Sequence, residues 1–232
     1  MQRIKSAFRF LILAGGGELG PGWSRVAVLG FPVIGLVFGI VLVIINRTFS
    51  PYLPTEILAA ALVTMLILAT GGHHLAGTHE TFNRLPKNLP TNSDGRRHVY
   101  GLLAVLLVII FKIHSLEVTG ESRAFSLLLT PLFARWSLLL LLFGSGAVTD
   151  DAAKPIAANI RSWHLLLASV ISLGLALFAA GAQALWVALS LSLLALFARG
   201  YLNRRAEGVS LANCGALIEL GEALSFTLFA TL

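Results

Sequence analysis

Charged residues are scarce in this sequence of 232 residues, at 12% Asp, Glu, Lys and Arg together. Soluble globular domains carry about 25%, and half that fraction cannot cover the surface of a protein of this size in water. The low charge and the mean hydropathy of +0.84 exclude a soluble globular protein and a disordered chain. The composition instead predicts a protein that crosses a membrane several times.

Cysteine is almost absent as well, because Cys214 is the only one in the sequence. A single thiol excludes an internal disulfide and a cysteine-based metal cluster.

Acidic residues are also few, with 11 Asp and Glu against 17 Lys and Arg. In a membrane protein, basic loops that face an anionic leaflet explain such a surplus, so we expect the lipid bilayer as a partner and no nucleic acid.

Long apolar runs are what the sequence has in abundance. The clearest covers residues 26–45, twenty residues without a charge, which is long enough to cross a bilayer as a helix. Further runs lie at residues 57–72, 99–116, 125–148, 163–180, 182–198 and 211–232. They do not alternate in polarity as the strands of a membrane β-barrel do. We therefore predict one all-α membrane domain over residues 1–232, a polytopic bundle of about seven transmembrane helices.

Lysines and arginines between these runs and near their ends predict the orientation in the membrane. Thirteen lie in the N-terminal segment and in the loops after the second, fourth and sixth runs, whereas the other side carries Arg47, Lys112 and Arg123. Because basic loops stay in the cytoplasm, we expect the N-terminus and these three loops on the cytoplasmic side of the inner (cytoplasmic) membrane. Lys112 lies near the end of its run, where its long stem is expected to carry the ammonium group to the interface. Residues 1–17 are predicted to form an amphipathic interfacial helix on the cytoplasmic surface.

The most polar stretch is the connection between the second and third runs, which we predict to be a cytoplasmic loop over residues 71–98. It holds four of the six histidines together with Glu80 and Asp94, and a loop of this length is usually functional. Carboxylates of this kind bind divalent cations, and arginines such as Arg84 and Arg96 bind phosphates. The alternative is a solvated loop whose basic residues bind lipid headgroups.

Besides Lys112, three charged residues lie inside the predicted spans. Glu219 and Glu222 are three residues apart and share one face of a helix, and Arg135 lies near the middle of another span. Charges inside a span are costly and usually face the interior of the bundle or a wet cavity. Two interpretations stay open, and they are compatible: Arg135 pairs with one of the glutamates, or the carboxylates line a substrate cavity.

Five stretches together resemble the cobalamin synthase family, the adenosylcobinamide-GDP ribazoletransferases. Residues 70–85, TGGHHLAGTHETFNRL, are similar to a signature of the form G-G-x-H-L-D-G-x-x-D-x-x-D-G, and residues 208–224, GVSLANCGALIELGEAL, to a C-terminal motif that ends in E-x-x-E. The other three stretches are residues 7–42, 93–116 and 130–142. The matches follow one another in the right order along most of the chain.

The resemblance implies a membrane transferase of cobalamin biosynthesis that joins adenosylcobinamide-GDP to α-ribazole and releases GMP, with Mg²⁺ as cofactor and a corrinoid and a nucleotide as substrates. Carried onto the matching positions, it implies three catalytic residues, His74, Glu80 and Asp94, of which Glu80 and Asp94 also hold the metal. The substrate-binding residues that it implies are Arg84, Arg96, Arg135, Glu219 and Glu222.

The chain departs from the family pattern at three acidic positions, where Ala76, Asn83 and Ala212 stand in place of Asp. Loss of one essential electrostatic stabiliser typically lowers a rate by about 10²–10³. The alternative function is therefore a catalytically inactive relative that acts as a binding or scaffolding subunit of a membrane complex. A CDP-alcohol phosphatidyltransferase is disfavoured, because the paired-Asp helix motif of those enzymes is absent.

Overall fold

The computed structural model describes residues 25–85, 94–145, 148, 154–205 and 208–232. This part of the chain is helical apart from its turns and one isolated bridge between Val148 and Val209. The helices are α2 (Arg25–Phe49), α3 (Thr55–Ala69), α4 (His73–Arg84), α5 (Asp94–Val118), the short η1 (Gly120–Ser122), α6 (Arg123–Leu142), α7 (Lys154–Asn159), α8 (Ser162–Ala180), α9 (Ala182–Arg204) and α10 (Leu211–Thr231). Six of them are long and apolar enough to cross a membrane, or seven if α3 and α4 count as one bent span. The predicted all-α polytopic bundle is thereby confirmed, whereas the interfacial helix expected at residues 1–17 lies outside the described residues.

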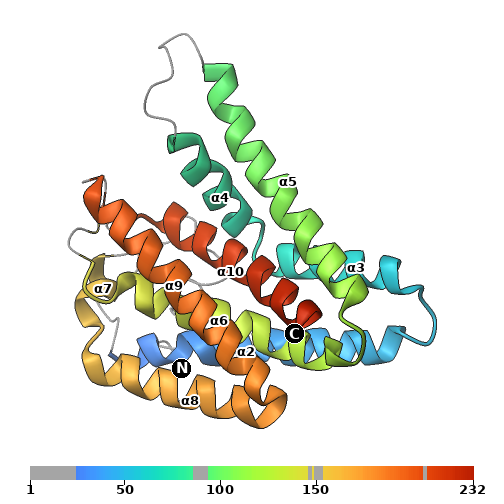
Figure 1. Cartoon of the computed structure of the whole chain (residues 1–232). Helices are drawn as coiled ribbons and strands as arrows, with labels where there is room; N and C mark the ends of the chain where they lie inside the picture. The colour runs from blue at the N-terminus through green and yellow to red at the C-terminus, as the bar shows by residue number, and fades with distance from the viewer. Residues whose placement is uncertain (1–24, 86–93, 146–147, 149–153, 206–207) are drawn as a thin grey trace.

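Helix α10 lies in the middle of the bundle and contacts α4, α5, α6 and α9 (Figure 1). Helix α6 is the other inner helix. In its most apolar stretch 83% of the residues are buried, against 22% in the corresponding stretches of α8 and of α9. Helices α4 and α5 pack side by side and form an arm that rises from the rest of the bundle (Figure 1). Helix α10 therefore joins the arm to the body of the protein, and α6 packs against α10 from the other side.

Two glycines let α2 lie directly on α6. A Cβ atom at Gly35 would lie 2.2 Å from the carbonyl oxygen of Pro131, and one at Gly39 would lie 2.2 Å from that of Leu128. Both distances are far below van der Waals contact, so only glycine fits. Small residues four apart are a common way for membrane helices to bring their backbones together, since lipid provides little hydrophobic drive for helix association.

The loop predicted over residues 71–98 is largely helical, and that prediction was wrong for residues 73–84, which form α4, and 94–98, which begin α5. Gly71 and Gly72 have positive φ angles of 60° and 70°, a conformation that glycine adopts readily. The chain bends there by 85° between α3 and α4. Although the sequence of α4 is polar, three of its residues, His74, Gly77 and Thr78, are buried. Packing of this face against α10 stabilises the helix.

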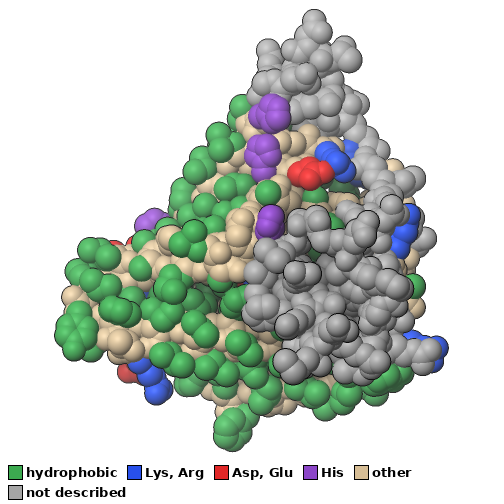
Figure 2. All heavy atoms as spheres, turned by 180° about the vertical axis from the view of Figure 1, so that it is seen from behind, with side chains coloured by type: hydrophobic (Ala, Val, Ile, Leu, Met, Phe, Trp, Pro, Cys, Tyr) green, Lys and Arg blue, Asp and Glu red, His purple; other side chains and the backbone are tan. Residues whose placement is uncertain are grey.

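The outer surface of the bundle is strongly apolar. Large hydrophobic side chains on α8 and α9 are exposed, among them Phe178 at 94% and Phe197 at 73%. Figure 2 shows hydrophobic side chains over the broad lower part of one face, with histidines above them. Exposed apolar area of this extent is typical of a surface that contacts lipid, which fits an integral membrane protein.

Candidate functional site

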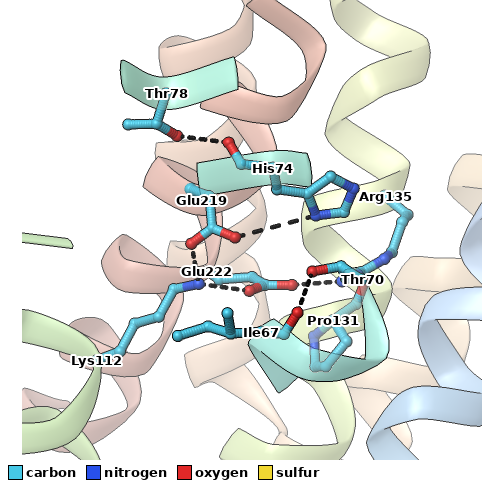
Figure 3. A network of polar contacts seen from close by, with 9 residues as sticks. All are labelled: Ile67, Thr70, His74, Thr78, Lys112, Pro131, Arg135, Glu219 and Glu222. Atoms are coloured by element: carbon cyan, nitrogen blue, oxygen red, sulfur yellow. Dashed lines mark hydrogen bonds and ion pairs between the residues drawn. The ribbon is translucent and has the colours of Figure 1, made fainter. Parts of the chain in front are cut away.

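Four charged side chains meet in the interior of the bundle (Figure 3). Lys112 on α5 places its Nζ atom 2.5 Å from Oε2 of Glu219 and 2.7 Å from Oε2 of Glu222, both on α10. From the opposite side, Arg135 on α6 donates a hydrogen bond through Nη1 to Oε1 of Glu222. All four residues are at most 2% exposed. The cluster contains two positive and two negative charges, so it is electrically neutral when all four side chains are ionised.

This cluster confirms one of the two interpretations left open for the charges in the spans, because Arg135 pairs with Glu222. The interpretation of Lys112 as a residue that reaches the membrane interface was wrong. Its side chain turns inward because α5 packs against α10 there, and two carboxylates replace the water that its ammonium group would otherwise need. Lys112 is therefore the residue of the cluster that the sequence did not assign to the site.

His74 joins the cluster to α4. Its Nδ1 atom lies 4.0 Å from Oε1 of Glu219, and its side chain is buried (Figure 3). Helix α4 approaches α10 closely at two glycines: a Cβ atom at Gly77 would lie 2.8 Å from the carbonyl oxygen of Ala212, and one at Gly215 would lie 3.1 Å from Cα of His74. The short distance between the helices is what places His74 beside the carboxylate of Glu219.

The acidic signature positions lie on the opposite face of α4. Positions 76, 80 and 83 are four and three residues apart, so they share one face of the helix. Ala76 is exposed and offers no polar atom beyond its backbone, while Asn83 accepts a hydrogen bond of 2.8 Å from the backbone N–H of Gly101 on α5. Glu80 pairs with Arg84 at 2.5 Å, and both side chains are about half exposed or more. Among its described side chains, this face therefore carries one carboxylate, that of Glu80, which forms an ion pair with Arg84 one helical turn away.

The structure brings some of the predicted site residues together and keeps others apart. Arg135, Glu219 and Glu222 form the buried cluster with His74 beside them, whereas Glu80 and Arg84 lie on the exposed face of α4. Asp94 and Arg96 belong to the first turn of α5, and their side chains lie outside the described part.

Within the described residues there is no group of three or more His, Cys, Asp or Glu side chains arranged to hold a metal ion. This does not exclude magnesium on chemical grounds, because Mg²⁺ is commonly held by one or two carboxylates together with substrate phosphates and water. The exposed carboxylate of Glu80 suits one such position. The residues present therefore fit an ion that the substrate helps to bind.

Comparisons with known proteins identify the family. The model of the family described as cobalamin-5-phosphate synthase matches residues 18–230. A relative from Pseudomonas fluorescens named adenosylcobinamide-GDP ribazoletransferase is 28% identical over 223 residues, which cover 87% of this chain and 88% of the relative. Relatives of the same name from Alkaliphilus metalliredigens and a Synechococcus species are 26% and 28% identical, over 88% and 90% of this chain and 85% and 86% of the relatives.

Solved structures give no match to this chain, so the family assignment rests on sequence. The matched region covers the described transmembrane helices except the last residue of α10, and it includes the signature on α4 and the two glutamates on α10. The chain belongs to the cobalamin-5-phosphate synthase family.

Proposed function

We propose that this protein is a membrane transferase that joins adenosylcobinamide-GDP to α-ribazole and releases GMP. The observation that carries the proposal is the family match over residues 18–230, supported by relatives of that name along most of the chain. The buried cluster supports it as well, because His74, Arg135, Glu219 and Glu222 occupy matching positions in the family motifs and meet in one place.

The reaction requires charge neutralisation and the removal of one proton. A hydroxyl oxygen of α-ribazole attacks the phosphorus atom that bears the corrinoid, a new P–O bond forms, and the bond from this phosphorus to the GMP oxygen breaks. The negative charge of the diphosphate must be offset as the hydroxyl approaches, and the hydroxyl proton must pass to a base. We assign phosphate binding to Arg84 and Arg96, and metal binding and proton transfer to Glu80 and Asp94. Mg²⁺ held by these two carboxylates and the substrate would supply further positive charge.

The roles of the buried residues follow from their contacts. Arg135, Glu219 and Glu222 stay predicted substrate-binding residues, and His74 stays a predicted catalytic residue. Their burial and mutual pairing support a positioning role: the cluster fixes α10 against α5 and α6, and His74 fixes α4 against α10. Helix α4 then presents Glu80 and Arg84 at a constant distance from α10.

For the membrane, we propose the inner membrane with the N-terminus and the connection between α4 and α5 in the cytoplasm. The C-terminal ends of α4 and α9 carry Arg84, Arg204 and Arg205, and Arg205 donates hydrogen bonds to backbone carbonyls at the end of α4. The basic ends of α4 and α9 therefore lie together. This supports the proposed orientation, because basic residues prefer the cytoplasmic side of a membrane.

Turnover in a defined membrane tests the function. Purified full-length protein in liposomes, given Mg²⁺, adenosylcobinamide-GDP and α-ribazole, should release GMP. Glu80→Gln should lower the rate by about 10²-fold or more, as removal of an electrostatic stabiliser does. Glu56→Gln is the matched control, because Glu56 is an exposed acid on α3, and its loss should leave the rate unchanged.

GMP release no greater than that of empty liposomes would contradict the proposal and favour the binding or scaffolding role in a membrane complex. Extraction in mild detergent tests that role directly, because a scaffolding subunit should come out bound to other subunits. Recovery of a lone protomer would count against the scaffold.

A further inference from the structure

A cavity of about 340 Å³ lies among α4, α6, α9 and α10, apart from the buried charge cluster. Its wall is mostly leucine and phenylalanine, including Phe82, Leu141, Leu194, Phe197, Leu217 and Leu220, and none of the described lining residues is charged. Because Phe197 is largely exposed on the outer face of α9, one wall of the cavity belongs to the surface that faces lipid. An apolar chain from the bilayer can therefore enter from the side.

A smaller cavity of about 30 Å³ adjoins the first and shares Thr81, Leu85, Tyr201, Leu202 and Asn213 with it. The shared residues mean that the two form one groove, which we call the α4–α9–α10 groove. The smaller end differs from the larger because it adds two arginines, Arg84 and Arg205. The groove is therefore apolar along its length and basic at one end.

Arg205 is held in place at this basic end. Its Nη2 atom donates to the carbonyl oxygen of Leu85 at 3.0 Å, and its Nη1 atom donates to the hydroxyl of Tyr201 at 2.8 Å. The guanidinium carbon also lies 5.2 Å from the centre of the Tyr201 ring. These contacts fix the position of the positive charge. None of the described residues that line either part of the groove is an acid. Arg84 is already paired with the carboxylate of Glu80, so the contact with an incoming anion falls to Arg205.

The length of the groove matches one leaflet. From Leu194 to Arg205 the chain advances eleven residues, which is about 16 Å at the rise of an α-helix. The hydrocarbon core of a bilayer is about 30 Å thick, so the groove covers roughly half of it. Basic pockets between transmembrane helices at the membrane surface are typical binding places for anionic lipid headgroups.

We propose that the α4–α9–α10 groove binds one phospholipid with an anionic headgroup. An acyl chain lies along the leucines of α9 and α10, and the phosphate lies at Arg205. Thr81 accepts a hydrogen bond of 3.2 Å from Asn213, and a hydroxyl that accepts one hydrogen bond can also donate one, here to a phosphate oxygen. The site lies at the junction of the arm with α9, so a bound lipid joins these two parts. This inference does not depend on the proposed enzymatic activity.

Lipid retention and thermal stability test the proposal. Full-length protein is purified in detergent and mixed with phosphatidylglycerol or with phosphatidylcholine of the same acyl chains. Native mass spectrometry should show one retained phosphatidylglycerol, and the melting temperature should rise with phosphatidylglycerol more than with phosphatidylcholine. Arg205→Gln should weaken phosphatidylglycerol binding about tenfold. Arg204→Gln removes the same charge from an exposed neighbour that does not line the groove, and it should leave binding unchanged.

A second variant separates lipid binding from damage to the end of α4, which Arg205 also contacts. Ala198→Trp fills the apolar part without touching Arg205, and it should abolish retention of phosphatidylglycerol. Leu193→Trp is its control, because Leu193 is 61% exposed on the same helix and lies outside the lining. Equal retention of the two lipids, or unchanged retention in both Arg205→Gln and Ala198→Trp, would overturn the proposal. If α-ribazole at the same molar concentration as the phosphatidylglycerol displaced it, the proposal would also be overturned, because the groove would then be a substrate pocket.

Discussion

Lys112 and Glu219 lie 107 residues apart in the sequence, yet the ammonium nitrogen of one is 2.5 Å from a carboxylate oxygen of the other. The contact joins α5 to α10 in the interior, and Glu222 extends it to Arg135 on α6. Moving charges out of water is costly, and mutual attraction repays the cost only when each charge keeps its partner. The balance of two cations and two anions therefore holds three helices in one arrangement.

Replacement of Glu222 by Gln should destabilise the protein strongly. Glu222 is the residue that contacts both Lys112 and Arg135, and its loss leaves two buried positive charges with one carboxylate. Breaking a buried pair by removing one partner costs about 3–5 kcal/mol. Denaturant unfolding in detergent micelles measures the change, with the exposed Glu121→Gln expected to alter stability by less than about 0.5 kcal/mol. Similar effects of the two substitutions would contradict the assigned geometry.

Removal of one cation and one anion together should be milder than the single changes predict. Lys112→Met leaves the two glutamates with Arg135 alone, and Glu219→Gln leaves Lys112 with Glu222 alone. The double variant keeps the pair of Arg135 and Glu222 and restores neutrality. A double-mutant cycle should give a coupling energy of about 0.5–3 kcal/mol. Purely additive changes in unfolding free energy would show that Lys112 and Glu219 do not interact.

Gly35→Ala should loosen the contact between α2 and α6. The new Cβ atom would lie 2.2 Å from the carbonyl oxygen of Pro131, so backbone must move, at a cost of about 1–3 kcal/mol. Gly174→Ala is the matched control within α8, because nothing lies within 4 Å of its Cβ position. The control should instead stabilise its helix, by up to about 1 kcal/mol. Thermal unfolding of both variants gives the comparison, and equal melting temperatures would refute the close approach.

Two added carboxylates should create a stronger divalent-metal site on α4. Ala76→Asp with Asn83→Asp places three acids on one helical face together with Glu80. Ala76 is exposed, and an Asp at position 83 keeps an oxygen for the hydrogen bond from Gly101. Terbium luminescence should show at least about tenfold tighter binding than in the parent protein, since oxygen ligands of this charge select hard cations. The same double variant with Glu80→Gln should lose most of the gain, and an unchanged affinity in the Glu80-containing variant would contradict the shared face.

Composition and long apolar runs were enough to predict the helical membrane bundle, because only segments whose backbone groups are all hydrogen-bonded internally, such as helices, can cross lipid. The partner of Arg135 was also predictable, since a charge inside a span needs an opposite charge nearby. Lys112 was misassigned because its place near the end of a run suited an interfacial lysine equally well. The helix at residues 73–84 was missed because its buried face consists of His74, Gly77 and Thr78, which carry no hydrophobic signal. The close helix contacts at Gly35, Gly39 and Gly77 could not be predicted, because they depend on how two helices pack in space.

The order of the four buried charges along the chain bears on how the protein enters the membrane. Both cations precede both carboxylates, and Glu219 follows Lys112 by 107 positions in the sequence. At a synthesis rate of about 5–20 residues per second, this delay lasts roughly 5–20 s. During that interval α5 and α6 hold positive charges that no glutamate of α10 can yet neutralise. Helix α10 is made after both of them and completes the charge cluster, so until it is in place water or another partner has to compensate the charges of Lys112 and Arg135.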